Sequence, residues 1–184
     1  MAHREDTVAQ QLKFADATPS KAFFIDMLTR DITVADAILD LVDNAVDKAV
    51  EVDRIDVSGQ LEGTPVQFVQ PREIRVTVSE TTFTIEDTCG GITLQEAEES
   101  VFLFGNPEER GADFGLSVYG IGMKRAFFKL GTRVQMESRT ANDYWSVTWP
   151  ISEWRAQHDW TVPIDRWESS EQATDAGWTK IDIR

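Results

Sequence analysis

The sequence predicts an α+β fold built as a two-layer sandwich of helices on a sheet. Several short segments alternate apolar and polar residues, which is typical of half-buried strands. Other segments carry apolar residues at helical spacing, and the two kinds do not follow a regular strand–helix–strand order. A chain of 184 residues, 41% of them hydrophobic, is long enough for a single domain with one core.

Two helices are predicted in the N-terminal part of the chain. Thr18 and Pro19 form a suitable N-cap and first-turn pair for the first helix, because proline needs no hydrogen-bond partner there. The hydroxyl of Thr33 can cap a second helix that extends to about Val50. The segment 52–71 contains two glycines and two prolines and is predicted to be a loop.

The remaining elements follow from the same two periodicities. Alternation predicts a hairpin of two half-buried strands at 74–78 and 83–85, and later strands at 133–137, 144–149 and 178–183. Helical spacing predicts helices at 94–104 and 120–130, with a loop over 105–119 between them. Five of the six tryptophans lie between Trp145 and Trp167, and their alternation favours packing beneath helices over an aromatic binding face.

Composition excludes several classes of function. A formal net charge of -14 opposes direct nucleic-acid binding by this domain, which would need clustered Lys and Arg. The single cysteine, Cys89, cannot form an intrachain disulfide, and His3 and His158 lack zinc-site spacing. A polar N-terminus and the lack of a long apolar stretch predict neither secretion nor a membrane span, so we expect a cytoplasmic protein.

The second predicted helix carries a stripe of acids and one amide beside its apolar face. Asp36, Asp40, Asn44 and Asp47 occur at i, i+4, i+8 and i+11. A solvated polar face is the ordinary explanation, but acids four residues apart repel, so a cation over the stripe is expected. The amide oxygen of Asn44 is a hard ligand suited to Mg²⁺, and Asp40 could orient a water toward a phosphate.

A second motif follows the strand that ends near Asp87. The glycines of Cys89-Gly90-Gly91 would also fit an ordinary strand-exit turn. Asp87 at a sheet edge can, however, accept a hydrogen bond from an exocyclic amine, and the glycines would let a flat ring approach the backbone.

A third motif, Gly120-Ile121-Gly122-Met123-Lys124, opens the helix at 120–130. A Walker A loop requires Lys where Ile121 stands, and a dinucleotide fingerprint requires Gly where Arg125 stands, so neither applies. The glycines would equally suit a helix start packed closely against a sheet. Free N–H groups at such a start nevertheless attract phosphate, with Lys124 nearby.

Together, these segments resemble the GHKL superfamily of ATP-binding domains, which includes gyrase B, heat-shock chaperones, histidine kinases and MutL, with microrchidia proteins close to them. Asp40 to Asn44 resembles the N-box, with a catalytic acid and a Mg²⁺-binding Asn, and Asp87 to Gly91 resembles the box whose Asp binds adenine. Gly120, Ile121, Gly122, Met123 and Lys124 resemble the glycine box, and Thr179 the threonine that supports the adenine contact. Asp47 matches a residue at the pocket rim, and Ile92 the apolar residue beneath adenine.

The resemblance implies a Bergerat fold: a mixed, mostly antiparallel sheet with helices on one face, spanning 1–184 as one domain. It also implies ATP with Mg²⁺ as ligands, a lid at 105–119 and an ATP-dependent homodimer with an N-terminal arm at 1–17. The chain ends just after a predicted core strand, so we expect it to be the N-terminal part of a longer protein that drives an unknown effector.

Three functions fit this resemblance. The first is a slow ATPase that acts as a conformational switch, and the second is an ATP sensor without useful hydrolysis. The third is a histidine-kinase catalytic domain, ranked last because such kinases generally carry Asn where Asp40 stands. Two departures bear on the choice: Asp40 is one methylene shorter than the Glu of many GHKL ATPases, and Cys89 replaces the first glycine of the adenine box.

Overall fold

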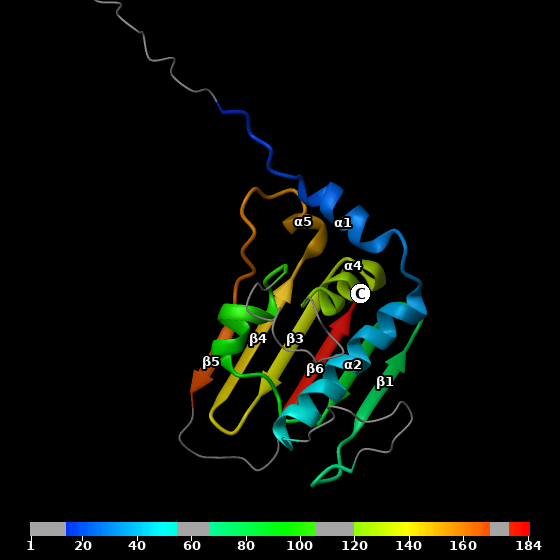
Figure 1. Cartoon of the computed structure of the whole chain (residues 1–184), viewed down its shortest axis with the longest axis vertical. Helices are drawn as coiled ribbons and strands as arrows, with labels where there is room; N and C mark the ends of the chain where they lie inside the picture. The colour runs from blue at the N-terminus through cyan, green and yellow to red at the C-terminus, as the bar shows by residue number, and fades with distance from the viewer. Residues whose placement is uncertain (1–13, 55–66, 106–119, 170–176) are drawn as a thin grey trace, which may run out of the picture.

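A computed structural model describes residues 14–54, 67–105, 120–169 and 177–184 of the chain. Figure 1 shows a single sheet with helices α2 and α4 lying across one of its faces, as predicted for an α+β sandwich. The described elements, in chain order, are α1 (Lys21–Thr29), α2 (Val34–Val52), β1 (Ile74–Val78), β2 (Phe83–Asp87), α3 (Leu94–Glu96), the π-helical η1 (Ala97–Val101), α4 (Gly122–Leu130), β3 (Val134–Arg139), β4 (Asp143–Trp149), α5 (Ile151–Trp154), β5 (Arg166–Ser169) and β6 (Trp178–Ile183).

The six strands lie in the order β1-β2-β6-β3-β4-β5, so the last strand of the chain occupies the middle of the sheet. Each of the five described pairings is antiparallel, in agreement with the mostly antiparallel sheet that was expected. In this register Ile181 lies opposite Ile85 on one side and Met136 on the other. Because side chains alternate along a strand, these apolar residues share one face of the sheet.

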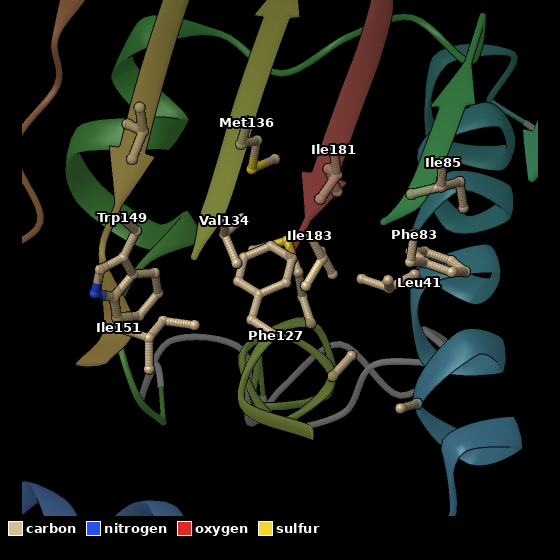
Figure 2. Close-up of a cluster of buried hydrophobic side chains, with 14 of the residues drawn as sticks. Leu41, Phe83, Ile85, Phe127, Val134, Met136, Trp149, Ile151, Ile181 and Ile183 are labelled. Atoms are coloured by element: carbon tan, nitrogen blue, oxygen red, sulfur yellow. The ribbon is translucent and has the colours of Figure 1, made fainter. Parts of the chain in front are cut away.

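The core lies between that face of the sheet and the helices. Figure 2 shows Leu41 of α2 and Phe127 of α4 among Val134, Ile183 and the other apolar side chains of the sheet. Trp145, Trp149 and Trp154 are at most 2% exposed and pack in this same core, as predicted for the tryptophans. Trp167 departs from the prediction, because its side chain on the edge strand β5 is 63% exposed.

Helix α2 begins where the sequence predicts because its cap is complete. The Thr33 hydroxyl accepts a hydrogen bond from the Asp36 N–H at 3.1 Å, and the Asp36 carboxylate accepts one from the Thr33 N–H at 2.8 Å. This capping box satisfies two N–H groups that would otherwise lack partners. Ala37, Leu41 and Ala45 then face the interior at intervals of one turn.

Helix α1 begins two residues later than the Thr18–Pro19 cap predicts. Ser20 is the N-cap, and its hydroxyl accepts a hydrogen bond from the Phe23 N–H at 3.2 Å. Lys21 then turns inward, where its ammonium donates to the Trp154 carbonyl at 2.9 Å and lies 3.7 Å from the centre of the Trp154 ring. This tertiary contact accompanies the start of the helix after Pro19.

Several other elements differ from the prediction or were not predicted. Strand β1 is not half-buried: Val76 is 41% and Val78 68% exposed, because β1 lies at the edge of the sheet. The exposed strand β5 and the single-turn helix α5 were not predicted. The helix predicted at 94–104 ends at Val101. Most of the predicted arm, of the 52–71 loop and of the lid lies outside the described residues.

None of the helices described here combines the length and apolar character needed to cross a bilayer.

Candidate nucleotide-binding site

The acidic stripe of α2 and the glycine-rich start of α4 lie against each other. A side-chain carbon built on Gly122 would lie 3.5 Å from the carboxyl carbon of Asp40. Gly122 is the first residue of α4, so the start of this helix lies close to the Asp40 carboxylate. The tertiary structure therefore brings the first and third motifs together.

Asn44 follows Asp40 by one helical turn. Its amide nitrogen donates a hydrogen bond to the Asp40 carbonyl oxygen within α2. None of the described residues donates to the Asn44 amide oxygen. That oxygen is the atom suited to Mg²⁺, so the described contacts fit the proposed metal ligand. Asp47, half-buried on the next turn of α2, also has an interaction partner.

Asp40 forms a two-pronged ion pair with Arg125 of α4. The Arg125 Nε donates to one carboxylate oxygen at 2.6 Å and Nη2 donates to the other at 2.7 Å. The hydrogen bond to Asp40 is the main cause of a raised pKa at Arg125, and the Asp36 charge adds to it. Arg125 therefore supplies the cation that the repelling acids of the stripe led us to expect.

The start of α4 has the features of an anion site. Its N-cap, Ile121, provides no side-chain hydrogen bond, and the first helical backbone bond is donated by Arg125. The N–H groups of Gly122 and Met123 therefore precede the first bond of the helix ladder. This uncapped start fits phosphate oxygens.

Side chains of the same motif point inward. Lys124 is 2% exposed, and its ammonium donates a hydrogen bond to the Gly120 carbonyl. This buried contact stabilises the glycine turn. Met123 belongs to the core. Gly120 has φ of +58°, a left-handed conformation that favours glycine.

The adenine-binding candidates meet at one end of the sheet. Asp87, the last residue of β2, lies directly opposite Thr179 of β6. One carboxylate oxygen of Asp87 accepts a hydrogen bond from the Cys89 N–H at 2.8 Å. Burial raises the pKa of Asp87 to about 6, against 3.8 for the free side chain. Hydrogen bonds from Cys89 and the Thr179 backbone oppose this shift, so the raised pKa reflects the burial of a carboxylate at the place where a ligand amine would donate.

Ser138 of β3 connects Thr179 to the residue predicted beneath adenine. The Ser138 and Thr179 hydroxyls are 3.1 Å apart, and Ser138 accepts a hydrogen bond from the Ile92 N–H at 2.8 Å. Ser138 is fully buried. It therefore fixes the Thr179 hydroxyl and the Ile92 backbone relative to each other.

The turn after β2 passes very close to neighbouring backbone. Gly90 and Gly91 have φ of +113° and +71°. A side-chain carbon on Gly91 would lie 2.0 Å from the Arg139 carbonyl oxygen, and one on Gly177 would lie 1.9 Å from the Gly90 carbonyl oxygen. Glycine is needed here both for backbone conformation and for space.

Cys89 replaces glycine without requiring an unusual backbone angle. Arg54 is the only described non-glycine residue with positive φ. The Cys89 side chain is 1% exposed and packs against Ala45 and Ala49 of α2. Burial, followed by the Asp87 charge, raises the pKa of the thiol to about 11, so it stays neutral near pH 7.

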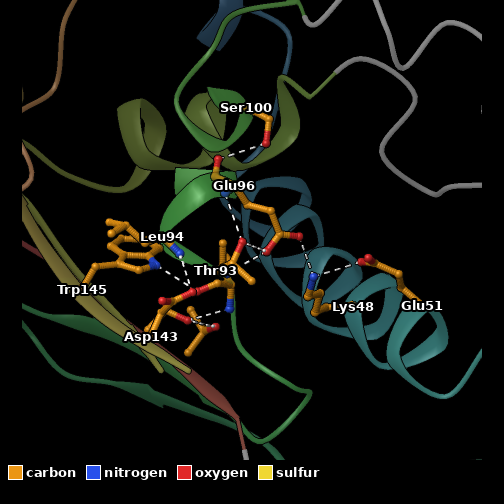
Figure 3. A network of polar contacts seen from close by, with 11 residues as sticks. Lys48, Glu51, Thr93, Leu94, Glu96, Ser100, Asp143 and Trp145 are labelled. Atoms are coloured by element: carbon orange, nitrogen blue, oxygen red, sulfur yellow. Dashed lines mark hydrogen bonds and ion pairs between the residues drawn. The ribbon is translucent and has the colours of Figure 1, made fainter. Parts of the chain in front are cut away.

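A polar network holds α2 to the segment after this turn (Figure 3). The Lys48 ammonium lies 2.7 Å from the Glu96 carboxylate, which in turn accepts hydrogen bonds from the Thr93 N–H and hydroxyl. The Trp145 indole donates to the Ile92 carbonyl at 2.9 Å. These contacts fix Ile92 at the predicted floor of the adenine site.

Sequence reasoning missed the roles of Arg125 and Ser138. Arg125 had a usable signal, because a stripe of acids without lysines requires a cation from elsewhere. Ser138 had none, since a lone serine in a strand gives no indication of its partners in β6 and the turn.

A described cavity at the adenine-binding candidates does not include the α2 residues of the site. It has a volume of about 350 Å³ and is lined by Asp87 and Thr179 together with charged residues such as Arg75, Glu86 and Lys180. Lys180 and Glu86 form an ion pair at 3.0 Å there. Within the described ranges, no cluster of three His, Cys, Asp or Glu side chains could hold a metal ion by itself.

Adenosine binding is expected to weaken as the pH falls through about 6. Only the ionised Asp87 carboxylate offers all its lone pairs to an exocyclic amine, so protonation removes acceptor capacity. Between about pH 7.5 and about pH 5 the affinity should fall about tenfold, since about a tenth of the group stays ionised one unit below its pKa. Titration calorimetry with adenosine measures this without a titrating phosphate, and Asp87→Asn should remove the pH step. An affinity independent of pH would contradict the assignment.

The six-stranded antiparallel sheet, with α2 and α4 across one face, is an α+β sandwich. Residues 32–179 match the model of the family described as histidine kinase-, DNA gyrase B-, and HSP90-like ATPase, and the chain belongs to this family. The match extends from the cap of α2 to Thr179, so it includes all three motifs. A comparison with curated proteins gives no match.

Proposed function

We propose that this domain binds ATP with Mg²⁺ and hydrolyses it slowly, and that the bound nucleotide controls a conformational and dimerisation switch. The observation that carries the proposal is the approach of Asp40, one turn before Asn44 on α2, to the start of α4. A metal ligand and a phosphate-binding helix start on adjoining helices can serve the same Mg²⁺-triphosphate.

Each part of the nucleotide has candidate partners in this proposal. Asp87 and Thr179 bind adenine, with Ile92 beneath the ring, while the N–H groups around Gly120 to Lys124 hold the phosphates. Asn44 binds Mg²⁺, which neutralises phosphate charge when bound. Asp40 orients the attacking water. A switch of this kind would act on an effector that belongs to a longer protein or a separate chain.

An ATP sensor without useful hydrolysis is the second candidate. Arg125 engages both carboxylate oxygens of Asp40. If that ion pair withholds the carboxylate from water, the domain would bind ATP without turning it over. Calorimetry beside a phosphate-release assay separates the two: binding without release favours the sensor.

Asn44→Ala is expected to weaken Mg²⁺-dependent ATP binding by at least about tenfold, because the variant lacks the hard oxygen ligand. Titration calorimetry in Mg²⁺ and again in EDTA measures the effect, which should appear only with the metal present. Asn142→Ala, an exposed amide in the turn before β4, is the matched control and should bind normally. Equal losses of affinity with and without Mg²⁺ would remove Asn44 from the metal site.

A further inference from the structure

The contact between Asp40 and Arg125 joins residues 85 positions apart in the chain. Its two hydrogen bonds, at 2.6 and 2.7 Å, occupy both carboxylate oxygens and both the Nε and Nη2 positions of the guanidinium. The Asp40 side chain is 16% exposed and the Arg125 side chain 35%. A two-pronged pair that is partly shielded from solvent is more rigid than a surface ion pair with one contact.

The position of this pair is unusual for a purely structural contact. Arg125 stands three residues after Gly122, on the helix whose start is assigned to phosphate. Asp40 stands one turn before Asn44, the proposed metal ligand. The described residues include a comparable pair elsewhere, Arg155 with Asp26 at 3.1 Å, which has a single contact and is more exposed.

We propose that Arg125 is a positioning residue that fixes the Asp40 carboxylate for hydrolysis of the bound nucleotide. The inference rests on the proposed ATPase function. In this proposal Arg125 affects the rate of hydrolysis only through Asp40. Other residues bind the adenine and the metal.

The chemistry of the pair supports positioning. A carboxylate has about four lone-pair sites, so two hydrogen bonds to a guanidinium leave others for a water. Asp is shorter than Glu, and an incorrectly held carboxylate about 1 Å away can lose about a hundredfold in rate. Holding both oxygens prevents the carboxylate from rotating away from the phosphate end of the site.

If the ion pair instead inhibits hydrolysis, it predicts the opposite effect of an Arg125 substitution on the rate. If Arg125 withholds Asp40 from water, removing the guanidinium should raise the rate. If Arg125 positions Asp40, removing it should lower the rate. The sign of the change in kcat therefore decides between the two.

The experiment measures kcat, KM and the calorimetric Kd for Mg²⁺-ATP in Arg125→Ala and Arg125→Lys. We expect kcat to fall about tenfold or more in the alanine variant, with Kd within about twofold of wild type. The lysine variant should recover part of the loss, since lysine keeps the charge but cannot make the two-pronged contact. Arg155→Ala, which removes the more exposed Arg155–Asp26 pair, should leave kcat unchanged.

A coupling test distinguishes positioning from general destabilisation. In an Asp40→Asn background, Arg125→Ala should cause no further loss of kcat, because the carboxylate it positions is gone. If the alanine variant does not fold, Arg125→Gln keeps the stem and one donor and serves in its place. A thermal melt of each variant checks folding.

Several outcomes would overturn the inference. An unchanged or higher kcat in Arg125→Ala, or a loss that persists in the Asp40→Asn background, would exclude positioning. So would a wild-type protein that binds Mg²⁺-ATP without releasing phosphate. A wild-type protein that does not bind Mg²⁺-ATP would instead refute the proposed function itself.

Discussion

Replacing Asp40 with asparagine is expected to lower the rate of ATP hydrolysis by at least about a hundredfold while the affinity for Mg²⁺-ATP stays within about twofold. Asparagine has nearly the same size, but it cannot accept a proton from water or hold an anionic charge beside Arg125. The metal ligand Asn44 and the start of α4 remain. The change should therefore appear in kcat and leave KM nearly unaltered.

A phosphate-release assay under saturating Mg²⁺-ATP measures this effect, with calorimetry for the affinity. Asp26→Asn is the matched control, because Asp26 is also paired with an arginine, Arg155, but lies on α1 away from the site. The control should hydrolyse ATP at the wild-type rate. If Asp40→Asn turns over normally while still binding ATP, Asp40 does not have the role proposed for it.

Replacing Gly91 with alanine is expected to destabilise the domain by about 3 kcal/mol or more. Two costs combine at this position. The backbone has φ of +71°, which strains any residue with a side chain. The added carbon would also lie 2.0 Å from the Arg139 carbonyl oxygen, so β3 or the turn would have to move.

Chemical denaturation of both proteins measures the loss of unfolding free energy. Gly105→Ala is a matched control, because Gly105 has φ of +74° but nothing within 4 Å of the position of the added carbon. That variant should lose only about 1 kcal/mol, the cost of the backbone conformation alone. Equal losses in the two variants would mean that the turn moves freely, and adenine binding should then survive in Gly91→Ala.

Features that depend on neighbouring residues could be predicted from the sequence. Thr33 and Asp36 complete their capping box within four residues, so the start of α2 was evident. Alternation predicted the hairpin of β1 and β2 and the strands β3, β4 and β6, with no end shifted by more than two residues. Such signals are local, and local interactions are encoded in residue spacing.

Features that depend on position in the sheet could not be predicted. Val78 alternates like a buried residue but is 68% exposed, because only the strand order reveals that β1 lies at the edge. Thr18 and Ser20 can both cap a helix, and the contact of Lys21 with Trp154 accompanies the later start. Strand β5 is short and exposed, so it carries no apolar alternation to detect.

The candidate site also has features that the sequence predicts and features that it does not predict. The residues that could serve a nucleotide are evident in the sequence, because the acid–amide helix, the glycine turn and the glycine-rich helix start each carry a chemical pattern at short spacing. The contact of Arg125 with both oxygens of Asp40, and that of Gly91 with Arg139, became evident only in the folded domain. Those contacts depend on how α2 packs on α4 and how the turn crosses β3, and a distance between residues far apart in the chain follows from packing.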